Sequence, residues 1–267
     1  GTSLSCAVDS GAFTPCSTSW KTPSLTTGTH TVRARTVEPG GRTTVAARTI
    51  VVDATAPTAK TTAMPLALLA TTTSLRFSAT DAGGSTVTSY DVRYRYASPT
   101  GAFTALSQPA GWQGLRSTTL ALALAKGYSY CFAVRARDAV GNVGAWTAET
   151  CTNVALDDRS LSGTGWTRGT SASYYLGTYT TVATSGRVLS ARVSARQVGI
   201  VVTTCSTCGV VDVRLAGAYL GRKSLASSTA RAKQILWLAY GVTRTGTLSL
   251  TTVGGKRVYV DGVVLRH

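Results

Sequence analysis

Apolar and polar residues alternate along most of this chain with a period of two. The clearest stretches are Thr31 to Arg35, Tyr90 to Tyr96 and Ala133 to Arg137, where small or apolar residues alternate with charged or hydroxyl residues. A period of two places successive side chains on opposite faces, one buried and one in water. The pattern predicts short antiparallel β-strands.

Two of these stretches are copies of one motif. Thr-Val-Arg-Ala-Arg at 31–35 and Ala-Val-Arg-Ala-Arg at 133–137 are each followed by a turn sequence, and they begin 102 positions apart (133 − 31). A second echo, Gly-Ala-Phe-Thr, occurs at 11–14 and again at 101–104. A spacing of this size is that of one β-sandwich domain, so the chain reads as a string of small sandwiches.

Turn and linker residues divide the chain into three predicted domains. Residues 1–55 hold a cysteine hairpin and a strand pair at 29–37 and 42–53, and Ala56-Pro57 then ends the ladder. The second domain covers 58–156. In 157–267 the pattern predicts about eight strands in about 110 residues, which is typical of a jelly roll or a related sandwich.

The composition of the 267 residues agrees with this all-β assignment. Hydrophobic residues make up 43% and charged residues 14%, and glutamate, a strong helix former, occurs only at Glu38 and Glu149. No apolar run approaches the roughly 18 residues that a helix needs to cross a bilayer. We therefore expect no transmembrane segment.

The six cysteines fall into three close pairs. Cys131 and Cys151 are symmetric about the turn at Gly141, and Cys6 and Cys16 are symmetric about Gly11, so each pair should meet across a hairpin. Cys205 and Cys208 form a C-x-x-C between two apolar runs. A zinc site would need further Cys or His ligands, and a redox motif should open a helix, so a structural disulfide is favoured there, with metal or redox roles as the alternatives. Three disulfides predict an oxidising compartment, with any leader segment removed or lying upstream.

These segments resemble known domain families. Residues 1–55 resemble the bacterial immunoglobulin-like repeats of secreted actinobacterial proteins in 6–16, 28–35 and 52–57. Residues 58–156 resemble a fibronectin type III domain in 89–95 and 128–142, and 157–267, from Asp157-Asp158-Arg159 through Trp166 to 260–262, is similar to the C-terminal sandwich that often follows such domains. The resemblance implies tandem antiparallel β-sandwiches (Ig-like, fibronectin type III-like and jelly-roll-like) and an Ig-like domain that lacks its first strands. It carries no catalytic residues.

The net charge of +16 is concentrated in the last domain. Residues 157–267 contain 11 arginines and 3 lysines against 4 aspartates, giving +10, whereas 1–55 give +2 and 56–156 give +4. Such a surplus favours an acidic partner. The alternative is that arginine replaces lysine because of the base composition of the genome, and that solvent-exposed strand faces need charge for solubility.

Aromatic residues in the same domain offer a platform on which sugar rings could stack, although aromatic residues also favour strands and cores. The predicted ligand-binding residues are three aromatics and six arginines: Trp166, Tyr175, Tyr179, Arg159, Arg168, Arg187, Arg192, Arg196 and Arg222.

Catalysis is not expected in this chain. A glycosidase needs two carboxylates flanking the bond, and the last domain offers only Asp157, Asp158, Asp212 and Asp261; the two histidines, His30 and His267, suit no serine triad. We expect no metal and no cofactor.

The sequence thus predicts a non-catalytic extracellular or cell-surface adhesion protein. Its basic C-terminal sandwich would bind an anionic polysaccharide or cell-wall polymer, and nucleic acid is not expected as a partner. Self-association by strand exchange at residues 1–55 is a further expectation, because an unfilled sandwich leaves an open sheet edge. The alternative is a structural subunit of an extracellular fibre or surface lattice with no ligand.

Overall fold

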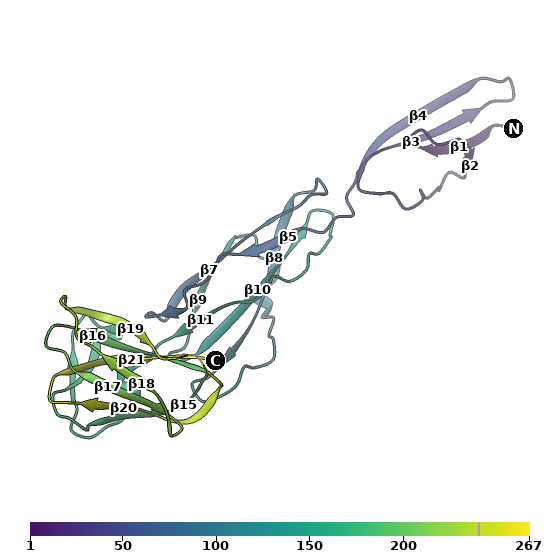
Figure 1. The fold of residues 1–267 in the computed structure, drawn as a ribbon. Coiled ribbons are helices and arrows are strands. Elements are labelled where there is room, and N and C mark those ends of the chain that lie inside the picture. The colour runs from purple at the N-terminus through teal and green to yellow at the C-terminus, as the bar shows by residue number, and fades with distance from the viewer. Residues whose placement is uncertain (240) are drawn as a thin grey trace.

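The computed structural model describes residues 1–239 and 241–267, and it is an all-β structure. Figure 1 shows the strands in three successive groups, with the N-terminus at one end and the C-terminus close to the middle group. We call these groups the N-terminal sheet, the middle sandwich and the C-terminal sandwich. They are built from β1–β4, β5–β11 and β12–β21 respectively.

The N-terminal sheet is a single antiparallel layer in the order β2-β1-β3-β4. Its strands are β1 (Ser3–Val8), β2 (Thr14–Pro15), β3 (Gly28–Val37) and β4 (Thr43–Val52). No second sheet covers it within the described residues, so only Cys6 and Ala7 are buried there. Strand β4 forms one edge and is largely exposed, with Val45 52% and Val51 69% accessible. The strand pair predicted at 29–37 and 42–53 is confirmed, while strand exchange is not supported.

The middle sandwich packs a three-stranded sheet, β5-β7-β9, against a four-stranded sheet, β6-β11-β10-β8. Its strands are β5 (Thr58–Thr61), β6 (Ala67–Leu68), β7 (Thr72–Thr80), β8 (Val87–Ala97), β9 (Thr119–Ala123), β10 (Ser129–Asp138) and β11 (Thr150–Val154). Leu75, Val92, Phe132 and Val134 are fully buried between the two sheets. The β8–β9 connection contains the 3-10 turn η1 (Ala110–Trp112) and runs back along the edge of β8.

The C-terminal sandwich packs two antiparallel sheets face to face. The first has the order β13-β14-β21-β16-β19, with β12 also paired to β21, and the second has the order β15-β20-β17-β18. Its strands are β12 (Leu156–Asp157), β13 (Thr167–Thr170), β14 (Thr178–Val182), β15 (Val188–Ala195), β16 (Gln197–Thr204), β17 (Val210–Leu215), β18 (Ala218–Ser224), β19 (Arg231–Trp237), β20 (Arg244–Val253) and β21 (Val258–Arg266). Two 3-10 turns, η2 (Asp158–Ser160) and η3 (Tyr175–Gly177), precede β13 and β14. The predicted boundary at 156/157 falls inside β12.

All three predicted disulfides are confirmed. Cys6 bonds to Cys16, Cys131 to Cys151 and Cys205 to Cys208, and no cysteine is free among the described residues. Cys131 and Cys151 occupy directly opposed positions of β10 and β11, as their symmetry about Gly141 predicts. The Cys205–Cys208 disulfide lies in the turn between β16 and β17 and opens no helix, unlike the C-x-x-C of a thioredoxin-type redox motif.

The middle and C-terminal sandwiches are packed against each other. A cluster of buried side chains on the outer side of the six-stranded sheet, which includes Tyr175, Val201 and Val264, is covered by Ala67 and Leu69 of the middle sandwich. The amide of Ser194 also donates to the carbonyl of Pro99 across this joint, at 2.7 Å. This joint brings residues that are distant in sequence into one site.

Candidate functional site

The aromatic residues predicted to bind a ligand do not form a stacking platform. Tyr175 is only 1% exposed, and its hydroxyl donates to the carbonyl of Ala155 at 3.1 Å, so its assignment as a ligand-binding residue was wrong. It lies in the turn η3 rather than in a strand, and it fills the joint between the two sandwiches. Trp166 packs against the core and donates from Nε1 to the carbonyl of Val188 at 3.0 Å.

Tyr179 is half-buried, and its ring packs against other aromatic rings. Its ring centroid lies 4.4 Å from that of Tyr174 and 5.8 Å from that of Tyr259, and the ring covers Gly169. A side chain at position 169 would meet the Tyr179 ring at 2.3 Å. Tyr179 therefore belongs to a row of half-buried rings with Tyr174 and Tyr259, and it makes no ring contact with Trp166 or Tyr175.

Two of the predicted arginines serve the structure. Arg168 donates to the carbonyls of Asp158 and Leu161 and lies 3.5 Å from the Asp158 carboxylate, while Arg159 lies 3.8 Å from it and donates to the carbonyl of Gly169. Asp158 is fully buried, and it also accepts hydrogen bonds from the hydroxyls of Thr178 and Thr180. A buried carboxylate requires such partners, so these arginines have a structural role although their side chains stay partly exposed.

The other predicted arginines are scattered. Arg222 makes a two-point ion pair with Asp212 at 2.7 and 2.8 Å. Arg187 and Arg192 are exposed, and Arg187 lies over the turn at Gly165, next to Trp166. Of the six, only Arg196 lines a substantial cavity with further charged residues.

That cavity is a cleft of about 520 Å³ between the middle and C-terminal sandwiches, which we call the joint cleft. Its walls carry three guanidinium groups, one carboxylate, a histidine, an amide, a phenyl ring and a disulfide: Leu66, Arg95, Phe103, Cys131, Glu149, Cys151, Asn153, Arg196, Arg266 and His267. Arg95 comes from β8 and Arg266 from the end of β21, whereas Arg196 lies between β15 and β16. Positive charge from both sandwiches therefore converges on one cleft.

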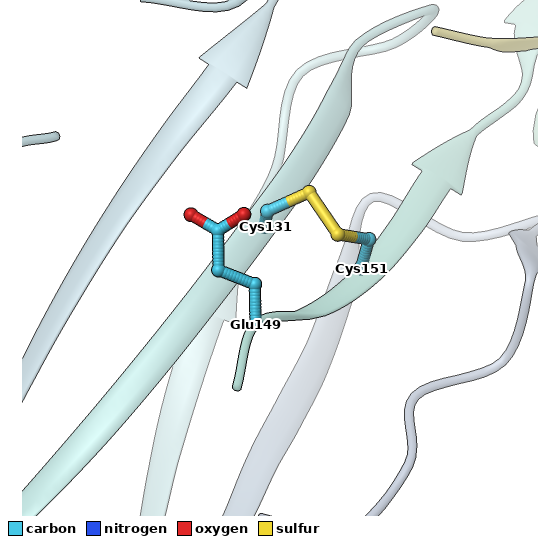
Figure 2. Close-up of side chains that lie close together, drawn as sticks. All are labelled: Cys131, Glu149 and Cys151. Atoms are coloured by element: carbon cyan, nitrogen blue, oxygen red, sulfur yellow. A yellow bond between two sulfur atoms is a disulfide. The ribbon is translucent and has the colours of Figure 1, made fainter. Parts of the chain in front are cut away.

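The wall from the middle sandwich is built around the Cys131–Cys151 disulfide. Figure 2 shows Glu149 beside this bond, and its carboxylate accepts from Nη2 of Arg95 at 2.6 Å. The guanidinium of Arg95 also stacks 4.8 Å from the centroid of Phe103. The two sulfurs and the carboxylate lie within 4.8 Å of one another, but bonded sulfurs are not thiolate ligands, so this group is not a metal site.

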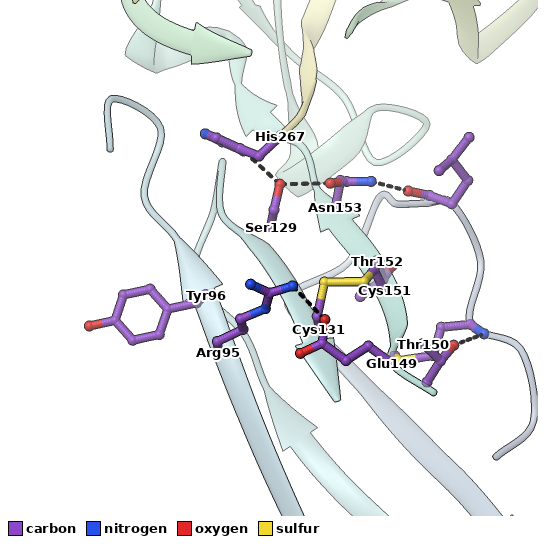
Figure 3. The surroundings of a disulfide bond; sticks show 12 residues. Arg95, Tyr96, Ser129, Cys131, Glu149, Thr150, Cys151, Thr152, Asn153 and His267 are labelled. Carbon is purple, nitrogen blue, oxygen red and sulfur yellow. Dashed lines mark hydrogen bonds and ion pairs between the residues drawn. A yellow bond between two sulfur atoms is a disulfide. The ribbon is translucent and has the colours of Figure 1, made fainter. Parts of the chain in front are cut away.

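The floor of the cleft is a hydrogen-bonded network between the sandwiches (Figure 3). The hydroxyl of Ser129 lies 2.6 Å from Oδ1 of Asn153, 3.0 Å from the carbonyl of Leu265 and 2.8 Å from Nδ1 of His267. Burial lowers the pKa of His267, so its ring is neutral at neutral pH. The histidine therefore holds the joint together without adding to the charge of the cleft.

The remaining carboxylates of the described residues lie outside the joint cleft. Asp157, Asp158 and Asp261 are all buried in the C-terminal sandwich. Asp53, Asp81 and Asp138 lie close together at the start of the middle sandwich, where Asp138 accepts from the amides of residues 140–142. Among the described residues that line the joint cleft, Glu149 is the one carboxylate, and it is paired with Arg95. The absence of catalysis stays a prediction.

Sequence reasoning missed Arg95, Arg266 and Glu149. The alternation over Tyr90 to Tyr96 puts Arg95 on the wet face, and the symmetry of the cysteines puts Cys131 beside that strand, so part of the signal was in the sequence. What joins these residues to Arg196 is the docking of two sandwiches, which no local pattern encodes.

Comparisons with known proteins give likenesses of fold. No family model matches this chain, and no curated protein matches it. Among solved structures, the fibronectin(III)-like modules of Clostridium thermocellum CbhA cover 58% of this chain and 77% of their own, with 15% identity and a TM-score of 0.28. Carbohydrate-binding modules of the β-sandwich superfamily cover 78% of this chain and 97% of their own, with 14% identity and a TM-score of 0.33.

An α-L-rhamnosidase from Dictyoglumus thermophilum is also similar over 79% of this chain, with 11% identity and a TM-score of 0.33, but the match covers 28% of that enzyme. At these scores the likenesses carry no argument about function. The chain is an all-β protein whose named strands pair antiparallel, except that β6 pairs parallel with β11. No helix among the described residues is long and apolar enough to cross a membrane.

Proposed function

We propose that this chain is a non-catalytic extracellular glycan-binding protein that holds an anionic glycan in the joint cleft. The observation that carries this proposal is the convergence of Arg95, Arg196 and Arg266 on one cleft of about 520 Å³. The volume lies in the range of small-molecule sites, and such sites are common where two domains meet. The three disulfides favour an oxidising, extracellular compartment.

The lining suits carboxylated, sulfated or phosphorylated sugars. Arginine presents a planar fork of donors that matches the oxygens of a carboxylate or phosphate. Phe103 and the side chain of Leu66 add apolar surface for the sugar ring, and Asn153 adds an amide that can hydrogen-bond a hydroxyl. The site thus differs from the surface of the C-terminal sandwich predicted from the sequence, but the class of ligand is the same.

Calorimetric titration of the full chain tests this function. Trigalacturonate and a short glycerol phosphate polymer represent the two anionic classes, with maltotriose as the uncharged probe. We expect at least one anionic probe to bind, with an affinity that falls as salt is raised to about 0.15 M and beyond, where the Debye length is about 8 Å or shorter. Maltotriose should show no salt-dependent binding.

Arg196→Gln and Arg266→Gln should each weaken the anionic probe by about tenfold, as loss of a charge-assisted hydrogen bond would. Arg192→Gln is the matched control, because Arg192 is exposed on β15 away from the cleft. Equal weakening in all three variants would mean a diffuse charge effect and would contradict the site.

A structural role in a fibre or surface lattice is the second candidate. The observation that favours it is the long, exposed edge strand β4, since unpaired strand edges template contacts between chains. Failure of every anionic probe to bind would leave this candidate standing.

A further inference from the structure

A second cavity lies in the middle sandwich, on the other side of the β8–β10 sheet from the joint cleft. Figure 3 shows Tyr96 and Arg95 pointing to opposite sides of β8, and Arg95 lines the joint cleft. The cavity has a volume of about 260 Å³ and is lined by six aromatic rings: Tyr94, Tyr96, Trp112, Tyr128, Tyr130 and Phe132. We call it the aromatic cavity.

The aromatic cavity exists because the sandwich is open on one side. Strands β8 and β9 are the edges of their two sheets, and the connection between them turns through η1 instead of adding a further long strand. Gln113 fixes this connection to β8 by donating from Nε2 to the carbonyl of Val92 at 3.0 Å, and the neighbouring Trp112 lines the cavity. The opposite wall consists of Ala123, Leu124 and Ala125, two of them small residues that leave room.

The tyrosines that line the cavity also bring their phenol hydroxyls to it. Tyr130 is buried, and its hydroxyl accepts from the amide of Ala125 at 3.0 Å. The hydroxyls of Tyr94, Tyr96 and Tyr128, in contrast, make no hydrogen bond to any residue that the structure describes, and these three side chains are half-buried. Aromatic faces with hydroxyls at their ends can pack on a ring and hydrogen-bond its substituents.

No charged side chain lines the aromatic cavity among the described residues. This feature separates it from the joint cleft, whose walls carry three arginines. A charged ligand would lose its hydration there with no opposite charge to compensate. The cavity therefore suits an uncharged ring.

An organic cation is the main rival ligand, because aromatic cages bind quaternary ammonium groups. Such a cage needs several ring faces directed at one centre. Here four neighbouring pairs run nearly parallel, with interplanar angles between 11° and 26°, whereas Trp112 is tilted by 51° to Tyr94 and by 42° to Phe132. Tyr96 is likewise tilted by 46° to Tyr128 and by 41° to Tyr130. The ring angles alone therefore do not decide between the two ligands, and what disfavours a cation is that no carboxylate lines the cavity among the described residues.

From the ring lining, the unpartnered hydroxyls and the absence of charge, we propose that the aromatic cavity is a binding site for a single neutral pyranose unit. One apolar face of the sugar would lie on the row of rings, and the phenol hydroxyls would hydrogen-bond its hydroxyl groups. This site is separate from the joint cleft, and it does not depend on the function proposed above.

Ligand-observed saturation-transfer NMR on the full chain tests the proposal, with methyl glycosides of glucose, galactose, mannose and xylose as probes. We expect saturable transfer to the ring C–H protons of at least one glycoside, unchanged between low and high salt. Methyl galacturonoside and choline are the charged comparisons. Absence of transfer to all four neutral glycosides, or a preference for choline, would overturn the proposal.

Variants locate the binding within the molecule. Trp112→Ala should remove one ring from the lining and weaken binding of the neutral glycoside at least tenfold, because Trp112 lines the cavity from the β8–β9 connection and is only partly buried. Tyr96→Phe removes one hydroxyl and should weaken binding about fivefold, in keeping with one hydrogen bond. Tyr219→Ala, an exposed aromatic of the C-terminal sandwich, is the control and should change nothing. Retained affinity in Trp112→Ala, with far-UV circular dichroism unchanged, would overturn the site.

Discussion

The side chain of Asp261 is fully buried in the C-terminal sandwich, and both of its carboxylate oxygens accept from the amide of Tyr175. Burial raises the pKa of this carboxyl to about 7, because the ionised form loses its hydration, and the negative charges of Asp158 and Asp157 raise it further, against the opposing charge of Lys233. Burial also raises the pKa of Asp157. These acids therefore make the sandwich sensitive to pH.

We predict that the C-terminal sandwich loses stability as pH rises from about 4 to 7. The Asp261 carboxyl has a pKa near 3.8 when unfolded and about 7 when folded, so in this window the folded state binds more protons and the free energy of unfolding falls with pH. Asp261→Asn keeps an acceptor for the Tyr175 amide and should remove most of the slope, leaving a smaller part from Asp157. Urea unfolding at several pH values, monitored by hydrogen exchange of this sandwich, measures the effect. An unchanged slope of unfolding free energy against pH in Asp261→Asn would refute the prediction.

Arg168 provides a second prediction at this scale. Arg168→Ala removes the guanidinium that lies against the buried Asp158 carboxylate, and should lower the stability of the C-terminal sandwich by about 2–3 kcal/mol, because a buried charge loses its partner. The exposed Arg192 is the matched control, and Arg192→Ala should stay within about 0.5 kcal/mol of the parent. Similar effects in the two variants would show that Arg168 is an ordinary surface arginine.

The long strands could be predicted from the sequence, and the short elements could not. The patterns predict strands at 29–37, 198–204, 210–215 and 258–265, and β3, β16, β17 and β21 cover them. Strand β17 alternates buried and more exposed positions, whereas β16 and β21 are buried on both faces and are marked by continuous apolar runs. Strands β5, β6 and β13 have only two to four residues, too few to show a period of two. Tyr174 and Tyr175 read as strand residues, but Gly177 and a positive φ at Leu176 close a 3-10 turn there.

The disulfide between β10 and β11 carries a prediction at the scale of elements. Replacing Cys131 and Cys151 with alanine should destabilise the middle sandwich by about 3 kcal/mol, since the bond closes a loop with a sequence separation of 20. The Cys205–Cys208 bond closes a separation of only 3, so the matching double alanine variant should lose about 1–2 kcal/mol. Denaturant unfolding of each variant beside the parent gives both values, and the reverse order would show that loop closure does not decide them.

The candidate sites depend on the arrangement of whole sandwiches, which is why only Arg196 of the predicted ligand residues lines the joint cleft. The sequence indicates charge and aromatic content in the C-terminal region, but the arginines that converge lie at positions 95, 196 and 266, on both sides of the joint. Their meeting follows from long-range packing of Ala67 and Leu69 on the outer face of the six-stranded sheet. No periodicity within one domain records such packing between domains.

If the joint assembles the cleft, loosening the joint should weaken anion binding without unfolding either sandwich. Leu69 packs against the Tyr175, Val201 and Val264 cluster, so Leu69→Asp places a charge in an apolar contact and should open the joint. We expect small-angle X-ray scattering to show a larger radius of gyration, and calorimetry to show at least a tenfold loss of affinity for whichever anionic probe the parent binds.

Leu106→Asp is the matched control, because Leu106 is an exposed leucine of the same sandwich and should leave both readouts unchanged. Saturation transfer to the neutral glycosides should persist in Leu69→Asp, since the aromatic cavity is lined entirely by residues of the middle sandwich. An opened joint with undiminished anion binding would mean that residues of one sandwich suffice for the anion, and that Arg196 and Arg266 do not act together with Arg95.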